Sequence, residues 1–239
     1  MLAQSPLLLP TDWDSNFQML LRWTHLLAGI TWIGLLYFFN LVSMPLLPTL
    51  DPPVRGQLIT LMLPKALWWF RWSAIVTVAA GVTYWIIILS RDHAPIARTL
   101  LIWAALIFAT IGIQALLLRM SALTKNSSAF VIAVLFVVGL QGHAMTKWLV
   151  YPAMSHRALS IAVGGGIGVF LMSNVLDIVW PAQQRFIAWC GANPGQPPPP
   201  DLAAALRRAQ LVSRASFWLS FPLLFFMAAA SHLPFFVAD

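Results

Sequence analysis

Six long runs of apolar residues divide the chain, and polar stretches that hold most of its prolines separate them. A helix needs about twenty apolar residues to cross a bilayer, and each run is long enough. The runs cover residues 17–43, 69–90, 98–118, 129–150, 158–180 and 213–234. The pattern predicts an all-α fold, an integral membrane bundle of about six transmembrane helices that forms one polytopic domain over residues 1–239.

Two of the polar connections are longer than the others. Pro45 to Lys65 holds a pair of prolines and then room for an interfacial helix, whereas Pro181 to Gln210 holds four consecutive prolines at 197–200. Such a run of prolines is a stiff, extended spacer, and Asp201 directly after it is a typical helix N-cap. Neither connection is long enough to form a second domain.

The composition excludes a soluble protein. Of the 239 residues, 60% are hydrophobic and 9% are charged, whereas a soluble domain has about 25% charged residues. The single cysteine, Cys190, excludes an internal disulfide, and no Cys-x-x-Cys-His motif is present to attach haem covalently. Residues 1–10 lack the positive start of a signal peptide, so we expect the first helix to insert the chain and remain.

The few charged residues indicate an orientation. We name the side on which the first run begins the X side and the other side the Y side. The X side has five Lys and Arg residues: Arg22, Arg91, Arg98, Lys147 and Arg157. The other nine fall on the Y side, which is therefore the cytoplasmic side by the positive-inside rule. We expect a bacterial plasma (inner) membrane protein with both termini outward, and a net charge of +7 that reflects topology rather than nucleic-acid binding.

Three histidines fall inside the apolar runs at similar depth in the X half: His25, His143 and His232. Ionisable residues within a membrane are costly and indicate function. Neutral imidazole is a common axial ligand of b-type haem, and two helices of a bundle can supply one ligand each. We therefore expect these residues to bind metal as ligands of one or two haem b groups, with the choice of ligand pair open.

The neighbours of these histidines suit a haem. Gly29, Gly139 and Ala228 each lie four residues from one of them, on the same helix face. Arg22 and Lys147 lie one turn nearer the X surface, where they are expected to bind haem propionates. The alternatives are that the histidines and small residues only pack the helices and that the two cations reach the headgroups.

Other signals are weaker. Met145 and Met227 are further possible axial ligands, and Gly164 to Gly168 has the small-xxx-small spacing of close helix packing. Asn174 and Asp177 near the Y end suit a polar contact, a proton path or a helix cap. No paired carboxylates, nucleophile elbow, phosphate loop or basic-aromatic cluster is present, so these give no support to hydrolases, nucleotide binding or nucleic-acid binding.

Four segments together resemble the membrane domain of the bacterial membrane-bound urate hydroxylase family, also named the urate oxidase N-terminal domain. They are RWTHLLAGITWIGLLYF at 22–38, LWWFRWSAIVTVAAG at 67–81, SHRALSIAVGGGIGVFLMSNVLDIVWPAQQ at 155–184 and LVSRASFWLSFPLLFFMAAASHLP at 211–234. The resemblance implies a multi-span helical domain, often fused to an outward-facing cytochrome c domain. This sequence ends at Asp239, so we expect any such cytochrome to be a separate protein.

The resemblance also bears on single residues. His25, Arg157 and His232 match the family pattern, whereas Trp68 and Ala162 stand where the pattern has histidines. The two replacements imply fewer haems and argue against a complete urate hydroxylase. His25 and His232 are then the first-choice axial pair, with Arg157 as a third propionate ligand.

Three hypotheses follow. The first is a haem b-binding membrane subunit that transfers electrons to cytochrome c or another outward-facing carrier, within a larger complex that contains other membrane subunits. The second is a membrane-bound oxidase or hydroxylase of urate or a related heterocycle that uses a separate cytochrome c. The third is a cofactor-free structural subunit.

Overall fold

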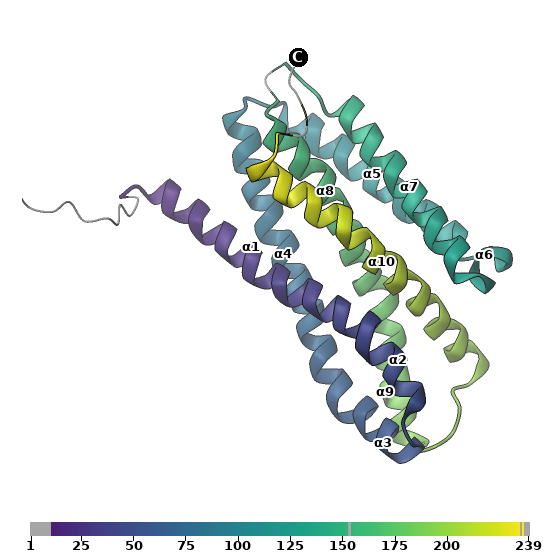
Figure 1. The fold of residues 1–239 in the computed structure, drawn as a ribbon. Coiled ribbons are helices and arrows are strands. Elements are labelled where there is room, and N and C mark those ends of the chain that lie inside the picture. The colour runs from purple at the N-terminus through teal and green to yellow at the C-terminus, as the bar shows by residue number, and fades with distance from the viewer. Residues whose placement is uncertain (1–10, 153, 235, 237–239) are drawn as a thin grey trace, which may run out of the picture.

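The computed structural model describes residues 11–152, 154–234 and 236 as helices and their connections (Figure 1). Residues 1–10, for which no cleaved signal peptide is expected, lie outside the described part. Six helical stretches are long and apolar enough to cross a membrane, which confirms the predicted fold class: Trp13–Thr49, Pro52–Arg91, Ile96–Leu117, Ser127–Trp148, His156–Ala192 and Pro200–His232.

The stretches are built from these elements, in chain order: α1 (Trp13–Tyr37), η1 (Phe38–Ser43), α2 (Met44–Leu46), η2 (Leu47–Thr49), α3 (Pro52–Gln57), η3 (Leu58–Met62), α4 (Leu63–Arg91), α5 (Ile96–Leu117), α6 (Ser121–Lys125), α7 (Ser127–Trp148), α8 (His156–Ser173), η4 (Asn174–Val179), α9 (Trp180–Ala192) and α10 (Pro200–His232). Side chains of Leu101, Phe108, Ile132 and Phe136 are exposed on α5 and α7. Such apolar surface is suited to contact with lipid.

Three prolines fail to end their helices because a wide turn precedes each one. Pro45, Pro64 and Pro181 are each the second residue after a π-helical segment, η1, η3 or η4. In each case the residue before the proline donates its amide to the carbonyl five residues back, as Met44 does to Phe39. Proline lacks an amide and clashes with the carbonyl four residues earlier. The wider π turn accommodates both effects, so the helix continues.

The extents predicted for the two long connections are therefore wrong. Most of residues 45–65 is helical, and only residues 193–199 join α9 to α10. Asp201 is not the N-cap of the last helix, because α10 begins at Pro200. Proline is favoured in the first turn of a helix, where its missing amide has no partner to lose. Asp201 lies in that turn and forms an ion pair with Arg185 of α9.

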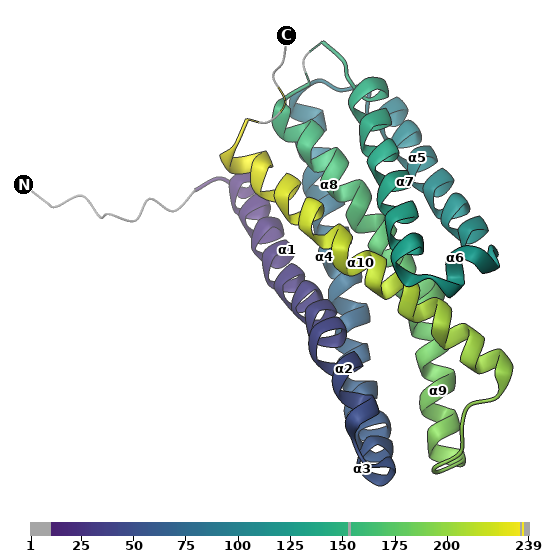
Figure 2. The ribbon, with the colours of Figure 1, turned by 45° about the vertical axis from the view of Figure 1, so that its right-hand side comes forward.

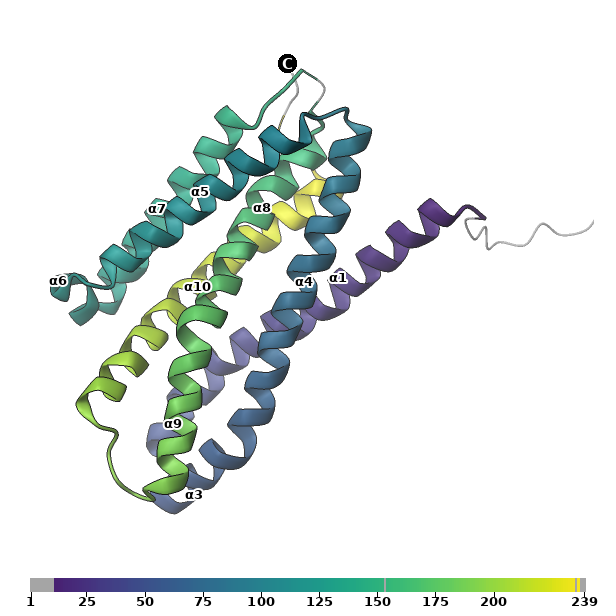
Figure 3. The same cartoon turned by 180° about the vertical axis from the view of Figure 1, so that it is seen from behind.

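α8 lies at the centre of the bundle. It contacts α4, α5, α7 and α10, and Figures 1 and 3 show it among these helices. Its glycines face different neighbours: a methyl group added at Gly164 would lie 2.7 Å from Cε of Met227 in α10, and one at Gly166 would lie 2.6 Å from Cε of Met145 in α7. The glycine-rich run therefore serves close helix packing.

Two buried tryptophans join α8 to α4 and α5. The rings of Trp85 and Trp103 lie 5.0 Å apart between centroids. Their indole N–H groups donate to the backbone carbonyls of Ala158 and Ala162, at 2.9 and 2.8 Å. Each buried indole thus has the hydrogen-bond partner that it needs away from water.

The remaining helices form two pairs on either side of this centre. α1 lies along α4, and α5 lies along α7 on the opposite side of α8 and α10 (Figure 2). α1 and α10 meet at Tyr37, whose hydroxyl accepts a hydrogen bond from Ser220 at 3.0 Å. From this contact the two helices diverge toward the X side (Figures 1 and 3). At the Y side, α3 and α9 extend beyond α6 (Figure 3).

We expect Gly164→Leu to lower the free energy of unfolding by about 1–3 kcal/mol, because the new side chain would overlap Met227 and Phe226. Gly139→Leu is the matched control, since nothing lies within 4 Å of a methyl group at this exposed position of α7. Unfolding in mixed micelles measures both. Equal stability of the two variants would contradict the central role of α8.

Candidate functional site

All five histidines lie at one end of the bundle. His25 is in the first half of α1, His143 and His232 are near or at the ends of α7 and α10, His93 is between α4 and α5, and His156 begins α8. Figures 1 and 2 show these helix ends on the same side, the X side. Within the described part of the chain, no three His, Cys or Asp side chains form a group that could hold one metal ion.

His25 is half-buried between α1 and α4. Its Nδ1 lies 2.8 Å from the backbone carbonyl oxygen of Thr77. A carbonyl oxygen only accepts hydrogen bonds, so Nδ1 carries the proton and Nε2 keeps its lone pair. Metal-binding histidines have this arrangement, in which a backbone carbonyl fixes the tautomer and the orientation of the ring. Nε2 is thus the ring nitrogen of His25 that could serve as a metal ligand.

Gly81 makes room for the His25 ring. A methyl group at Gly81 would lie 2.7 Å from Cε1 and 2.8 Å from Nδ1 of the imidazole. Any larger residue would therefore push the ring away from Thr77. Gly29, which the sequence pattern pairs with His25, instead faces Thr77. A methyl group added at Gly29 would lie 3.7 Å from Cγ2 of Thr77.

His232 is exposed at the last residue of α10. It lies eleven residues after Phe221, which is about three helical turns, so both residues are on the same helix face. The Phe221 ring lies 6.0 Å from the ring of Tyr37 in α1, measured between centroids. His232 is therefore on the face of α10 that meets α1 lower in the bundle, and the divergence of the two helices leaves it uncovered.

Arg157 connects α8 to the end of α10. Its Nε donates to the backbone carbonyl of Ala230, at 3.3 Å, although the residue is exposed. A cation at the C-terminal end of a helix is favourable because the last carbonyls have no partner in the helix. Arg157 thus bonds to the last turn of α10, at the residue two positions before His232.

His143 and Lys147 are exposed on α7. α7 lies on the side of α8 and α10 that is away from α1, as all views show (Figures 1, 2 and 3). His143 and His25 therefore do not face each other. Met145 and Met227, the other possible ligands, fill the space beside Gly166 and Gly164 and serve packing.

Arg22 lies on the same side of α1 as His25. Its guanidinium carbon is 5.9 Å from the centre of the Tyr84 ring in α4, a cation–π contact. About two turns nearer the X surface, Asp14 of α1 forms an ion pair with Arg91 at the end of α4. These contacts hold the two helices together above the imidazole.

Two groups outside the helices on the X side have shifted pKa values. Hydrogen bonding from the Ser15 backbone amide lowers the pKa of Asp12, which caps α1. Burial, with a smaller effect of the Asp92 carboxylate, raises the pKa of Tyr151 to about 12. Asp12 is therefore an anion and Tyr151 a neutral phenol at physiological pH.

The two positions at which the resemblance places histidines have different surroundings. Ala162 is fully buried, and its carbonyl accepts the Trp103 indole hydrogen bond described above. Trp68 is exposed on α4, with its ring 5.0 Å from that of Trp69 between centroids. Packed indoles thus occupy the space next to Ala162.

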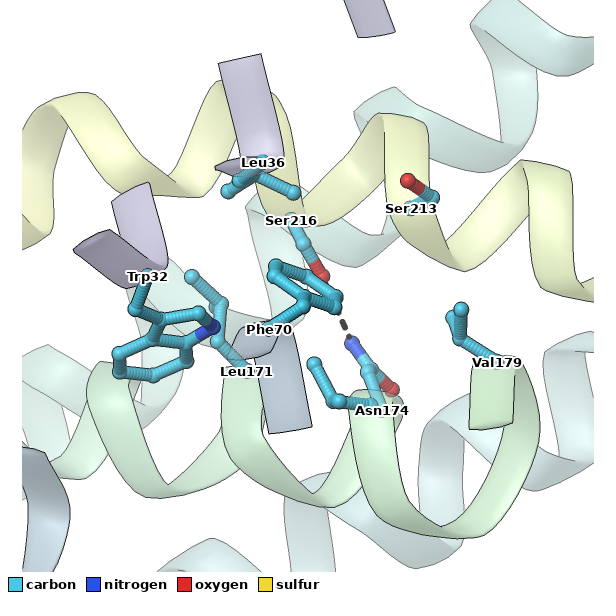
Figure 4. A pocket seen from close by; sticks show the side chains of 9 residues that line it. Trp32, Leu36, Phe70, Leu171, Asn174, Val179, Ser213 and Ser216 are labelled. Carbon is cyan, nitrogen blue, oxygen red and sulfur yellow. Dashed lines mark hydrogen bonds between the residues drawn. The ribbon is translucent and has the colours of Figure 1, made fainter. Parts of the chain in front are cut away.

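A small, mainly apolar cavity with three polar side chains in its lining lies deeper in the bundle, toward the Y side (Figure 4). It has about the volume that one water molecule needs. Asn174 lines it and donates to Ser216 at 3.1 Å, while the Gln114 amide donates to the Asn174 oxygen. Ser213 lines the same cavity and accepts from Asn40. Asn174 thus makes a polar contact between helices and is not a helix cap.

Sequence reasoning missed Thr77 and Gly81 as part of the site. They are 52 and 56 residues from His25, and neither a helical threonine nor a helical glycine indicates a metal site by itself. The available signal was the four-residue spacing of Thr77 and Gly81, which places them on one helix face.

Together these features define a class: a multi-span helical membrane protein that holds a histidine by a backbone carbonyl inside the membrane. Residues 53–239 match the family model described as urate oxidase N-terminal. The match covers more than half of the chain, so this chain belongs to that family. The matched region begins after His25. Neither the curated proteins nor the solved structures give a significant match.

We expect Gly81→Ala to break the hydrogen bond between His25 and Thr77, because the methyl group would overlap the ring. ¹⁵N-histidine NMR of the metal-free protein, with the signal assigned by His25→Gln, should show a protonated, hydrogen-bonded Nδ1 only before this substitution. Gly34→Ala on α1, which meets open space, should leave the signal unchanged. The same signal in both alanine variants would contradict the assigned contact.

Proposed function

We propose that this chain is a haem b-binding membrane subunit that transfers electrons to a carrier on the X side. One observation carries the proposal: the Nδ1 of His25 donates to Thr77, which leaves Nε2 as a ligand within a membrane helix. A b-type haem supplies one-electron chemistry when it is bound. The residues of this chain then orient the ligand, exclude water and set the potential through burial and charge.

His232 is the proposed second ligand. It lies on the α1-facing side of α10, and the residues below it on this face are apolar and uncovered: Phe221, Leu224, Phe225 and Ala228. An apolar face beside an imidazole is suited to a porphyrin ring. His143 is the alternative ligand, for a second haem or for contact with another subunit, because it is exposed on the far side of the bundle.

Arg22 and Arg157 are the proposed partners of the propionates, with Lys147 in the same role at His143. Arg22 lies one turn nearer the X surface than His25. Arg157 donates a hydrogen bond to the carbonyl of Ala230, two residues before His232. Arginine binds carboxylates in a bidentate manner, and these cations lie toward the X surface. Their charge would favour the oxidised or reduced haem according to how completely the propionates neutralise it.

The proposed location is the inner membrane of a bacterium, with both termini outward and the X side facing the periplasm. The supporting observation is the excess of cations on the Y side. A carrier such as cytochrome c would then meet the end of the bundle that holds the histidines. Other membrane subunits are proposed to cover the exposed face of α7, which holds His143.

A second candidate function is favoured by the family match. A membrane-bound oxidation of urate or a related heterocycle, with electrons passed to a separate cytochrome c, agrees with the family description.

The purified protein should show a b-type haem in its pyridine haemochrome spectrum. His25→Ala should remove the low-spin spectrum, and Gly81→Ala should weaken haem binding about tenfold because the ligand loses its hydrogen bond. His93→Ala, in the turn between α4 and α5, is the matched histidine control and should bind haem normally. Protein that assembles without any haem would contradict the proposal and favour a structural subunit.

Reduction of cytochrome c in the presence of urate distinguishes the two candidate functions. If the chain is an electron-transfer subunit alone, urate should not reduce added cytochrome c in the presence of the haem-loaded protein. Urate-dependent reduction that His25→Ala abolishes would instead support the oxidase. Cytochrome absorbance at its reduced band measures the rate.

A further inference from the structure

We propose that the Y side holds a binding site for the phosphate of an anionic phospholipid, between α5, α10 and the η4–α9 segment. A cavity of about 420 Å³ opens there, which is within the range of small-molecule sites. Three arginines from three elements line it: Arg119 after α5, Arg185 in α9 and Arg208 in α10. The proposal is independent of haem and of the X side.

The charges around this cavity leave room for one anion. Arg185 is already paired with Asp201. Arg119 and Arg208 form no ion pair with any residue in the described part of the chain, and both are exposed. Asp177 is the acidic residue that lines the cavity. Three cations against two carboxylates give a net charge of +1, which a phosphate diester neutralises.

The position of the cavity fits the level of lipid headgroups. α5 has 22 residues, which corresponds to about 33 Å of helix. This length matches the hydrocarbon core of a bilayer, about 30 Å thick. If Arg98 near the start of α5 is at one interface, Arg119 just after its end is at the other, where phosphates lie.

The walls of the cavity fit the rest of a lipid. Ala115 in the last turn of α5 and Leu118 directly after its end line it. On the same face of α5, two turns from Ala115, Phe108 is exposed and provides an apolar path for acyl chains toward the membrane centre. A soluble anion would gain nothing from this path, whereas a phospholipid buries its chains along it.

Arginine rather than lysine suits the proposed ligand. Two guanidinium groups can each donate two hydrogen bonds to phosphate oxygens. Asp177 accepts hydrogen bonds and would disfavour a second anion while bonding to headgroup hydroxyls. Phosphatidylglycerol, with one phosphate and a glycerol headgroup, therefore serves as the probe, and phosphatidylcholine as the zwitterionic comparison. Basic pockets between membrane helices commonly bind anionic headgroups in this way.

The test uses the full chain, delipidated in detergent, with thermal unfolding and native mass spectrometry as readouts. Phosphatidylglycerol should raise the unfolding temperature and remain bound, whereas phosphatidylcholine should do neither. Arg119→Gln/Arg208→Gln should weaken phosphatidylglycerol binding at least tenfold, because each charge-assisted hydrogen bond contributes about a factor of ten. Arg98→Gln, at the other end of α5, is the matched control and should bind normally.

Two further arms keep the outcome decisive. Arg119→Lys/Arg208→Lys keeps both charges but loses the bidentate hydrogen bonds, so it should bind phosphatidylglycerol more weakly than the unchanged protein and more tightly than the glutamine variant. A folding defect of the glutamine variant is recognised by comparison with it. Equal stabilisation by both lipids, or equal phosphatidylglycerol binding by the glutamine variant and by Arg98→Gln, would overturn the proposal. Equal stabilisation by millimolar inorganic phosphate alone would also overturn it, in favour of a site for soluble anions.

Discussion

Contact between the backbone of α8 and its neighbours is the constraint on which the arrangement of the other helices depends. In a bilayer, lipid tails are as apolar as leucine, so helices associate through close packing rather than through escape from water. Gly164 and Gly166 let α10 and α7 approach α8 from different directions, with methionine side chains filling the remaining space. Trp85 and Trp103 fill a third side and donate to carbonyls of α8. The positions of α4, α5, α7 and α10 therefore all depend on one helix surface.

The same absence of water explains the polar groups of the interior. Asn174 bonds to Gln114 and Ser216 from two other helices, because an unpaired amide in this environment would be costly. The π turns also reduce the number of unpaired backbone groups, since they let each helix continue past a proline, which has no amide hydrogen to donate. η4 combines both: it begins at Asn174 and ends just before Trp180 and Pro181. A single irregular segment thus positions the polar contact and directs Asp177 toward the Y-side cavity.

The sequence was sufficient for the number of spans and for placing the histidines at one end of the bundle, since hydropathy reports the order and direction of the spans. It was not sufficient for the helix ends, because Pro45 and Pro181 indicate breaks unless the preceding turn is known to be wide. It also could not show which histidines face each other. The position of a histidine along its helix can be predicted from that helix alone. The direction in which its side chain points in the bundle depends on the order of the helices around α8. His25 and His143 therefore have similar depth but opposite positions, and Gly81 becomes part of the site only through the pairing of α1 with α4.

The contact of Tyr37 with Ser220 divides the interface of α1 and α10 into two regions that differ in packing. On the Y side of this contact, Asn40 of η1 donates to Ser213 of α10. Trp32 and Leu36, which precede Tyr37 in α1, are almost fully buried in the core beside it. Toward the X side the axes of α1 and α10 diverge (Figure 1), and the side chains on the face of α10 that ends in His232 are exposed. A group bound between α1 and α10 above Tyr37 would contact both helices without displacing any residue of the glycine-packed centre. Binding there would cost little packing energy, whereas a site beside Ala162 would require removal of the indoles that join α4, α5 and α8.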